Sequence, residues 1–418
     1  MSKTGGFLVS LEKNDLLILL FLLPSQFGYH LWPGFAHIFG IRVDYLSPTI
    51  YVTDLLLLSL FFLWAAKGPK IPKSLLLGLV ATTVFAVINI SLAVKIDPAM
   101  VKWLKILELS FFSYYIYSLS SLDLKKQVIR PLSLSIIFFS LLAIAQFFLQ
   151  RTVGGPLYFL GERSFSASTP GIALVNFFGK EYLRAYSTFS HPNSLAGFLG
   201  ASMFILFAQR AGKNARLKTF SLILGLFTFF LTFSLGAYLG LLSAGIFYLI
   251  IRNFEGYSKR LTNFVFLGLM LLSVIMPVLA GQLVYKGISF REDVYDRVVL
   301  SEAAGRIFSS SPLWGIGLNN FIIKLPEVVG SPHLSWWLQP VHNIFLLILS
   351  ESGIVGLIFF SYLILRALKK ALELKRLALF LSLIFIVVTG SIDHYWLTLQ
   401  QNQLLFSLVL GLSLRNTN

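Results

Sequence analysis

Long apolar runs recur along the whole chain, and polar connections separate them. A helix needs about 20 mostly apolar residues to cross a bilayer, whereas the strands of a membrane barrel alternate apolar and polar positions. The pattern therefore predicts an all-α polytopic membrane protein, with a single membrane domain over residues 1–418 and about 12 transmembrane helices. The predicted spans lie near 15–33, 48–66, 74–94, 103–121, 131–150, 192–209, 218–234, 236–251, 261–281, 340–365, 377–392 and 397–414.

The composition agrees with a chain embedded in lipid. Hydrophobic residues make up 56% of the chain and charged residues 12%, against roughly 25% charged residues in soluble domains. These values exclude a soluble globular enzyme and a disordered chain. There is no cysteine, which excludes disulfides, thiolate nucleophiles and cysteine metal sites. The apolar run after Asp15 lacks a small-residue cleavage pattern, so we interpret it as the first span rather than as a cleaved signal.

Basic residues gather in alternate connections, and this sets the predicted orientation. Short cytoplasmic loops carry an excess of Lys and Arg, so both termini are predicted to be cytoplasmic. These segments account for the whole net charge of +16, and no nucleic-acid partner is needed to explain it. The basic clusters lie in residues 67–73, 125–130, 210–218, 252–260 and 366–376.

Two long connections, residues 151–190 and 282–339, then face the outside. Connections longer than about 12–15 residues are usually functional or disordered. Both contain aromatic residues and turn signals rather than low-complexity sequence, so we expect ordered structure at the outer face. Apolar residues at helical spacing near 294–310 predict an amphipathic helix there.

The first outer connection ends in YLRAYSTFSHPNSLAG, residues 182–197. Pro192 predicts the start of a helix, and the free N–H groups of a helix start favour an anion. Arg184 could bind the same anion bidentately, or it could only anchor the connection to lipid headgroups. His191 is either a site residue or the cap of this helix.

The second outer connection contains DRVVLSEAAGRIFSSSPLWGIGLNNF, residues 296–321. Nine positions separate Arg297 from Arg306, so on a straight helix they point to opposite faces and cannot serve one site. Arg306 lies nearer the end of the predicted helix, where a cation favours the helix dipole. Arg297 shares the polar face with Ser301, and both a functional and a solvated role stay open for it.

The tenth predicted span opens with QPVHNIFLLILSESGIVG, residues 339–356. Pro340 predicts a first turn that includes His342. A histidine there can take a proton near neutral pH, or it can simply form a hydrogen bond at the interface. Glu351, inside the span, marks either a site or a tie between close-packed helices. His333 is a weaker candidate in the preceding connection.

The remaining polar residues of the spans gather toward the predicted outer face. A transporter would more often place polar groups and broken helices at the midplane of the membrane, so this asymmetry favours a site that opens outward. No HExxH, Walker or Rossmann pattern occurs, and no carboxylate cluster has the spacing of metal ligands. The sequence therefore predicts neither a metal nor a nucleotide cofactor. The polar residues concerned are Asp54, Lys105, Glu108, Asp393 and His394.

Three ordered segments, together with the twelve-span layout, resemble the family of O-antigen ligases and O-antigen polymerases, which are multispanning membrane glycosyltransferases. They are RAYSTFSHPNSLAG at 184–197, DRVVLSEAAGRIFSSSPLWGIGLNNF at 296–321, and VHNIFLLILSESGIVG at 341–356. The resemblance implies an enzyme at the outer face of the cell membrane. Such an enzyme would move a glycan from an undecaprenyl diphosphate carrier to the hydroxyl of an acceptor sugar, without a metal or cofactor and with inversion of the anomeric carbon.

The resemblance also implies roles for individual residues. His342 matches the general base of the family, and Arg184 and Arg297 match its arginines that bind the pyrophosphate. The acceptor stays open, because ligases, repeat-unit polymerases and protein O-glycosyltransferases share these segments. A transporter or flippase for lipid-linked glycans is the alternative from another class. Secondary candidates on the same segments are His191, Asn193, Asn343, Arg306 and Glu351.

Overall fold

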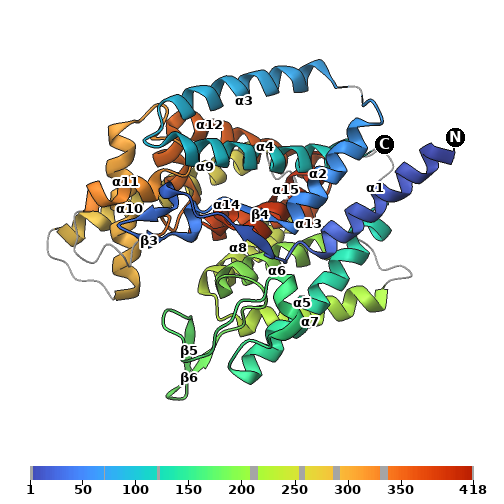
Figure 1. Ribbon diagram of the computed structural model, residues 1–418, viewed down its shortest axis with the longest axis horizontal. Coiled ribbons are helices and arrows are strands. Elements are labelled where there is room, and N and C mark those ends of the chain that lie inside the picture. Colours follow the sequence, from blue (N-terminus) through green and yellow to red (C-terminus); the bar gives the residue numbers. More distant parts are fainter. Residues whose placement is uncertain are drawn as a thin grey trace.

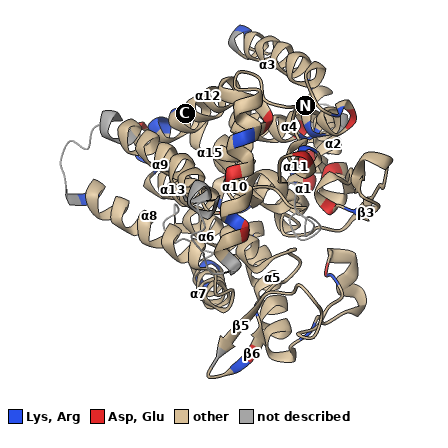
Figure 2. Cartoon of the chain, turned by 90° about the vertical axis from the view of Figure 1, so that its left-hand side faces the viewer, with Lys and Arg blue, Asp and Glu red and all other residues tan. Residues whose placement is uncertain are grey.

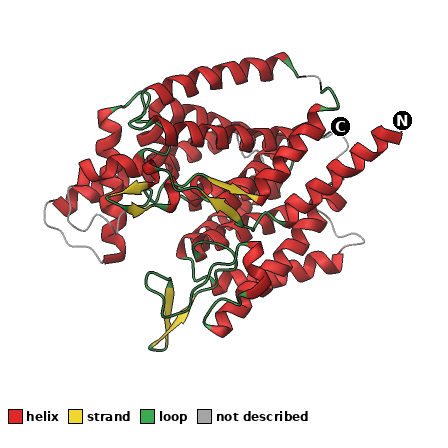
Figure 3. Cartoon of the chain, viewed as in Figure 1, coloured by secondary structure: helices red, strands yellow, loops and turns green. Residues whose placement is uncertain are grey.

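The computed structural model describes residues 3–69, 71–119, 123–207, 215–253, 259–285, 292–329 and 338–416, and His333 lies outside them. Helices dominate these residues, and short strands pair only in two-stranded antiparallel sheets (Figures 1 and 3). The all-α prediction therefore agrees with the fold. The α-helices are α1 (Lys3–Phe21), α2 (Val52–Ala65), α3 (Lys73–Ser91), α4 (Ile96–Ser118), α5 (Arg130–Leu149), α6 (Pro192–Phe207), α7 (Ala215–Leu231), α8 (Leu235–Asn253), α9 (Lys259–Tyr285), α10 (Glu292–Ser310), α11 (Phe321–Val329), α12 (Ile344–Glu373), α13 (Leu377–Gly390), α14 (Tyr395–Thr398) and α15 (Gln400–Leu414).

Shorter elements fill the connections between the helices. Strand β1 pairs with β4, β2 with β3, and β5 with β6. The strands are β1 (Gly28–His30), β2 (His37–Ile38), β3 (Ile41–Arg42), β4 (Thr49–Tyr51), β5 (Leu174–Phe177) and β6 (Lys180–Leu183), and the single turns of 3-10 or π-helix are η1 (Gly34–Ala36), η2 (Asp44–Leu46), η3 (Leu124–Ile129) and η4 (Gly155–Leu160).

Helices α13 and α15 form the centre of the protein. Helix α13 packs against α6, α8 and α12, and α15 packs against α4, α12 and α6. Almost every side chain of both helices is buried, including the four polar residues that open α15, 400–403. Buried amides need hydrogen-bond partners, so the start of α15 is the place in the core where polar structure is to be expected.

The outer helices carry large apolar side chains on their exposed faces. Leu77 on α3 is 72% exposed, Leu235 on α8 is 76% exposed and Phe264 on α9 is 77% exposed. Figure 2 shows that α3 and α8 have charged residues only at their ends. Among the described residues, three helices are long and apolar enough to cross a membrane, and shorter apolar helices accompany them. Lipid is the solvent that suits such a surface, which identifies a membrane protein.

The first predicted span is wrong in its second half. Helix α1 ends at Phe21 rather than near residue 33, because Pro24 lacks an N–H and Ser25 closes a turn on the carbonyl of Leu22. The following residues, 22–51, form β1, η1, β2, β3, η2 and β4 instead of helix. This segment, which we call the β1–β4 segment, lines one cavity together with residues of α4 and of the start of α15.

Helix α12 also differs from its prediction. It begins at Ile344 rather than near Pro340, because the side chain of Asn343 takes the capping position and accepts from the N–H groups of Phe345 and Leu346, at 2.9 and 3.1 Å. The tenth span is therefore preceded by a short extended segment that carries His342.

Helix α12 is broken at Gly353, which has φ 65° and ψ −168°. The loop of residues 311–317 fills the break. Its N–H groups at Ile316 and Gly317 donate to the carbonyls of Ser350 and Glu351, and the N–H of Ile354 donates to the carbonyl of Pro312. Every backbone group that the break releases at these positions is thus paired within the protein.

We predict that Gly353→Ala destabilises the protein by at least about 1–3 kcal/mol, the usual cost of a strained backbone. Only glycine adopts this backbone conformation freely, and an added Cβ would lie 2.3 Å from the carbonyl oxygen of Leu313. Thermal unfolding of the purified protein in detergent measures the effect. The control is Gly268→Ala in α9, where a Cβ meets nothing within 4 Å; equal melting temperatures for the two variants would contradict the role of the break.

Candidate active site

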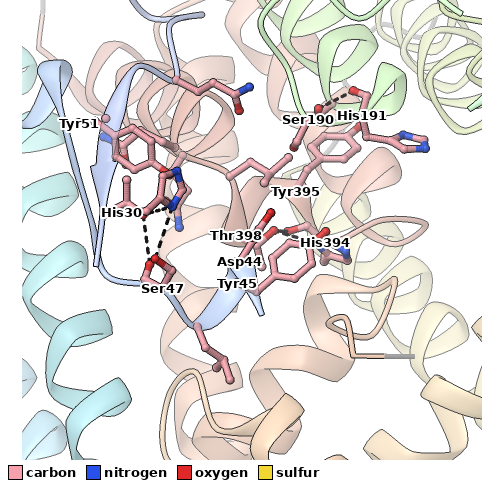
Figure 4. Close-up of a pocket in the computed structure, with 18 of the residues that line it drawn as sticks. His30, Asp44, Tyr45, Ser47, Tyr51, Ser190, His191, His394, Tyr395 and Thr398 are labelled. Carbon is pink, nitrogen blue, oxygen red and sulfur yellow. Dashed lines mark hydrogen bonds between the residues drawn. The ribbon is translucent and has the colours of Figure 1, made fainter. Parts of the chain in front are cut away.

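A polar cavity of about 540 Å³ lies where the β1–β4 segment meets α4, the start of α6, and α14 with the start of α15. Figure 4 shows His30 and Tyr51 on one side of it, His191 and His394 on the other, and Thr398 and Tyr45 between. The cavity is thus elongated. We call the part lined by Arg297, His342, Asp393 and His394 the His342 end.

The carboxylate of Asp393 joins the segments of the His342 end. Asp393 lies in the turn between α13 and α14, and 8% of it is exposed. Its Oδ2 accepts a hydrogen bond from Asn193 Nδ2 at 3.1 Å, and its Oδ1 accepts from the N–H of His394 at 2.8 Å. The same Oδ1 lies 3.4 Å from Nδ1 of His342. One carboxylate therefore connects the start of α6, the turn after α13 and the residue before α12.

Asp393 remains ionised in this environment. Burial raises its pKa, but the neighbouring His342, His394 and Arg297 outweigh burial and hold the pKa well below its ordinary value. A fixed negative charge beside an imidazole stabilises the imidazolium that forms when the ring takes a proton. Asp393 can therefore support base catalysis by His342.

His342 lies at the wall of the cavity beside Asp393. Its side chain is 17% exposed and lines the cavity, and its Nδ1 is buried on the side of Asp393. This Nδ1 forms no hydrogen bond with the described residues and lies 3.4 Å from the carboxylate, so a proton on Nδ1 would leave Nε2 as the atom that accepts another. Asn343 fixes the backbone behind it, because its Nδ2 donates to the carbonyls of Ser273 and Ser391 at 2.7 and 3.1 Å.

The two predicted anion-binding arginines converge on this turn from distant parts of the chain. Arg297 of α10 lines the cavity and donates to the carbonyl of Ile392 at 3.0 Å. Arg184 lies one layer behind the cavity wall. It donates to Asn193 Oδ1 at 2.8 Å and to the carbonyl of Thr232 at 2.6 Å. Arg184, Asn193 and Asp393 thus form a continuous chain of hydrogen bonds.

His191 both lines the cavity and caps α6. Its Nδ1 accepts from the N–H of Asn193 at 3.1 Å, and its carbonyl accepts from Ser194 and Leu195. Burial lowers the pKa of His191 to about 4. The ring is therefore neutral near pH 7 and already has a structural task, which is the capping role that the sequence left open.

The structure does not bring Arg306 and Glu351 to the cavity. Arg306 forms an ion pair with Glu302 at 2.5 Å on the exposed side of α10. Glu351 is buried at the break in α12, where its Oε1 accepts from the N–H of Phe321 at 3.1 Å. Its contacts are those of a tie between α12 and the start of α11.

Sequence reasoning missed the central role of Asp393 and His394 and the place of Tyr45. The Asp-His pair was visible as polar residues at the outer end of a span, but nothing in the sequence connects it to His342. Tyr45, whose ring meets that of His394 edge to face at 5.3 Å, follows the run misread as the first span. Burial raises the pKa of Tyr45, so its hydroxyl stays protonated and can donate into the cavity.

His342, Asp393 and His394 are also the group of described residues that could hold a metal ion, since one ligand atom from each lies within 4.8 Å of the others. Two features of the residues oppose a cation here. Arg297 lies beside the carboxylate, and His394 directs its Nδ1 to the hydroxyl of Thr398 at 2.7 Å. We therefore expect the trio to work as a base with its supporting charge.

These features define a helical membrane protein with a polar cavity at one end of its apolar helices. A family model described as O-antigen ligase matches residues 220–361, and it supports membership of the chain in the O-antigen ligase family. This stretch of the chain is therefore similar to the membrane proteins of the O-antigen ligase family. The matched region includes Arg297 and His342, whereas Arg184 and Asp393 lie outside it. No curated protein matches this chain.

Proposed function

We propose that this protein transfers a glycan from undecaprenyl diphosphate to the hydroxyl of an acceptor sugar, in the manner of an O-antigen ligase. The observation that carries the proposal is the cluster formed by Asp393 with Asn193, His394 and His342, which we call the hub. Around this carboxylate, His342, Asn193 with Arg184 behind it, and Arg297 come together from distant parts of the chain, which supports the roles of base and anion ligands proposed for them. Displacement of a diphosphate by a hydroxyl requires a general base for the hydroxyl and positive charge near the leaving group.

The step begins when the acceptor hydroxyl gives its proton to Nε2 of His342. The acceptor oxygen then forms a bond to the anomeric carbon of the donor sugar, while the bond from that carbon to the phosphate oxygen breaks. The leaving oxygen takes the bonding electron pair and departs as undecaprenyl diphosphate. Attack opposite to the leaving group inverts the anomeric carbon. Asp393 stabilises the His342 imidazolium throughout.

The arginines stabilise the charge that develops on the diphosphate. Arg297 stands in the cavity wall and is the direct ligand in this proposal. Arg184 acts from behind through Asn193 and adds a second positive charge to the same region. With His191 neutral, the charges of Arg297 in the wall and of Arg184 behind it stand near the carboxylate of Asp393, so the His342 end favours an anion. The diphosphate is a good leaving group, and this clamp replaces a metal in the proposed chemistry.

The orientation completes the proposal. In this proposal both termini are cytoplasmic, about 12 spans cross the inner or plasma membrane and the cavity opens at its outer face, as the distribution of basic connections favours. The two chain ends lie on one side of the structure, and α10, α11 and the β2–β3 hairpin lie toward the other (Figure 1). Donor lipid, acceptor glycan and membrane lipids are then the partners.

Two alternatives differ from this proposal in separate ways. A repeat-unit polymerase would use the same site with a lipid-linked acceptor. A transporter or flippase would need a polar path beyond the cavity, and a broken helix is the feature that transporters use for it. Here the break in α12 is closed by backbone bonds to the 311–317 loop, which favours the enzyme.

We predict that His342→Ala lowers the rate of glycan transfer by about 10²–10⁴-fold, the usual contribution of a general base. Asp393→Asn keeps the shape of the hub but removes its charge, so it should lower the turnover rate by a smaller factor. Both are measured with a lipid diphosphate glycan donor in detergent. His37→Ala is the matched control, because His37 lies outside the cavity and contacts the carbonyl of Pro33. Full activity of His342→Ala would exclude the assigned base.

Removing metal ions with a chelator distinguishes two roles for His342, Asp393 and His394: a general base with its neighbours, or the ligands of a metal ion. We predict that transfer continues at an unchanged rate when the protein is dialysed against EDTA and assayed in its presence, because the arginine clamp supplies the positive charge. The activity should also not rise when Mg²⁺, Mn²⁺ or Zn²⁺ is added back. Loss of activity in EDTA with recovery on adding one of these ions would instead assign His342, Asp393 and His394 as metal ligands.

A further inference from the structure

The cavity extends well past the reacting residues, and its far part has a different chemistry. Residues of the β1–β4 segment and the start of α15 line it, and the side chains concerned are aromatic, hydroxyl or amide groups (Figure 4). We call this part the Tyr51 end and define it by His30, Thr49, Tyr51, Gln400 and Gln403.

The Tyr51 end has no surplus of positive charge. Lys105 forms ion pairs with Asp54 at 2.8 Å and with Glu108 at 2.7 Å. Lys102 is the other cation of this wall, and it donates to the carbonyl of Leu397 at 2.6 Å. Asp44 also lines the cavity and acts on Tyr51, so two cations stand beside three carboxylates at this end. A diphosphate gains nothing from this end, in contrast to the His342 end, so the ligand group held here is uncharged.

The side-chain amides of Gln400 and Gln403, at the start of α15, donate through their nitrogens and keep their oxygens as hydrogen-bond acceptors. Gln400 uses its Nε2 to donate to Asp54 Oδ1 and Thr53 Oγ1, at 2.5 and 3.2 Å. Gln403 uses its Nε2 to donate to the carbonyl of Leu397. The Oε1 atoms of both glutamines accept no hydrogen bond from the described residues. Because both side chains line the cavity, these oxygens suit hydroxyl donors of a ligand.

The rings of His30 and Tyr51 line the same end of the cavity, and their neighbours hold them in place. Thr49 Oγ1 lies 2.9 Å from His30 Nδ1, and the His30 ring stacks on Trp32 with centroids 5.9 Å apart. The Tyr51 ring meets His30 edge to face and lies 5.7 Å below the Lys105 ammonium. Rings fixed in this way offer apolar faces with a low entropy cost of binding.

We infer that the Tyr51 end is a pyranose-binding subsite, which holds sugar units of a glycan while its terminal unit reacts at the His342 end. A pyranose ring has an apolar C–H face that packs on an aromatic ring and hydroxyls that donate to amide oxygens, so it matches both the rings and the amides of this end. The absence of a positive surplus favours sugar over phosphate. The inference rests on the proposed function and adds the place where the glycan chain extends. The sugar comes either from the donor or from the acceptor.

The test compares Tyr51→Leu and Gln403→Leu with Tyr29→Leu. Tyr29 is 70% exposed, precedes His30 in β1 and lies outside the cavity, so its replacement is the matched control. Each Tyr51-end variant should raise one glycan KM about tenfold and leave the turnover rate nearly unchanged, as expected for one aromatic contact or one hydrogen bond made equally before and during reaction. Inhibition by inorganic pyrophosphate, which probes the His342 end, should stay as in the unmodified protein.

The arms of the assay identify the source of the sugar. A rise confined to the donor KM assigns the subsite to the donor glycan, and a rise confined to the acceptor KM assigns it to the acceptor. Unchanged KM values for both substrates, in variants with unaltered melting temperatures, would overturn the subsite.

A second measurement keeps the subsite separate from the proposed function. If the unmodified protein transfers no glycan at all, the proposed function fails, and the subsite is then tested by saturation-transfer NMR with the donor glycan released from its lipid by mild acid. Binding that is weaker in Tyr51→Leu than in Tyr29→Leu supports the subsite. Equal binding in the two variants overturns it.

Discussion

The candidate site depends on one buried carboxylate. Asp393 accepts from Asn193 and from its own neighbour His394, and it stands beside the His342 ring. A buried charge is costly unless its oxygens are paired, and removing one partner of such a group usually costs several kcal/mol. The pairing therefore fixes how the start of α6, the α13–α14 turn and the residue before α12 lie relative to one another.

The helices around the hub explain why it can be rigid. The hub follows α13, which is buried on all sides, and Asn343 ties the start of α12 to the carbonyl that precedes Asp393 by two residues. Arg297 holds the carbonyl of Ile392, the residue in between. The turn is thus fixed by side chains from α10 and α12 as well as by its own backbone. Preorganised groups of this kind stabilise a transition state without rearranging during the reaction.

The division of the cavity follows from charge. Arg297 and Arg184 lie at the His342 end, while at the Tyr51 end Lys105 is paired with both Asp54 and Glu108. A lipid diphosphate glycan has the same division, with a charged linkage and an uncharged sugar chain. The charged linkage of the proposed donor therefore matches the His342 end, and its sugar chain matches the Tyr51 end. The kinetic assay distinguishes a donor sugar from an acceptor sugar at the Tyr51 end.

Much of the helical architecture can be read from the sequence, because lipid-facing and core helices both need long apolar runs. Pro192 correctly marks the start of α6. The same reasoning failed at Pro340, where the side chain of Asn343 starts the helix instead, and at residues 22–33, where apolar residues belong to strands and turns. The motifs indicate Arg184, Arg297 and His342 as candidates, and the structure places them around one turn. Asp393 could not be found in this way, because its role comes from contacts with residues 200 and 51 positions away in the chain.

The central claim is that Arg297 holds the donor diphosphate at the His342 end, and initial rates of glycan transfer at varied donor concentration test it most directly. The comparison is Arg297→Gln with Arg306→Gln, two arginines of the same helix, of which the second pairs with Glu302 outside the cavity. The account predicts that Arg297→Gln loses transfer or needs far more donor, with its melting temperature retained, whereas Arg306→Gln resembles the unmodified protein in donor use. Wild-type donor kinetics in Arg297→Gln would contradict the account.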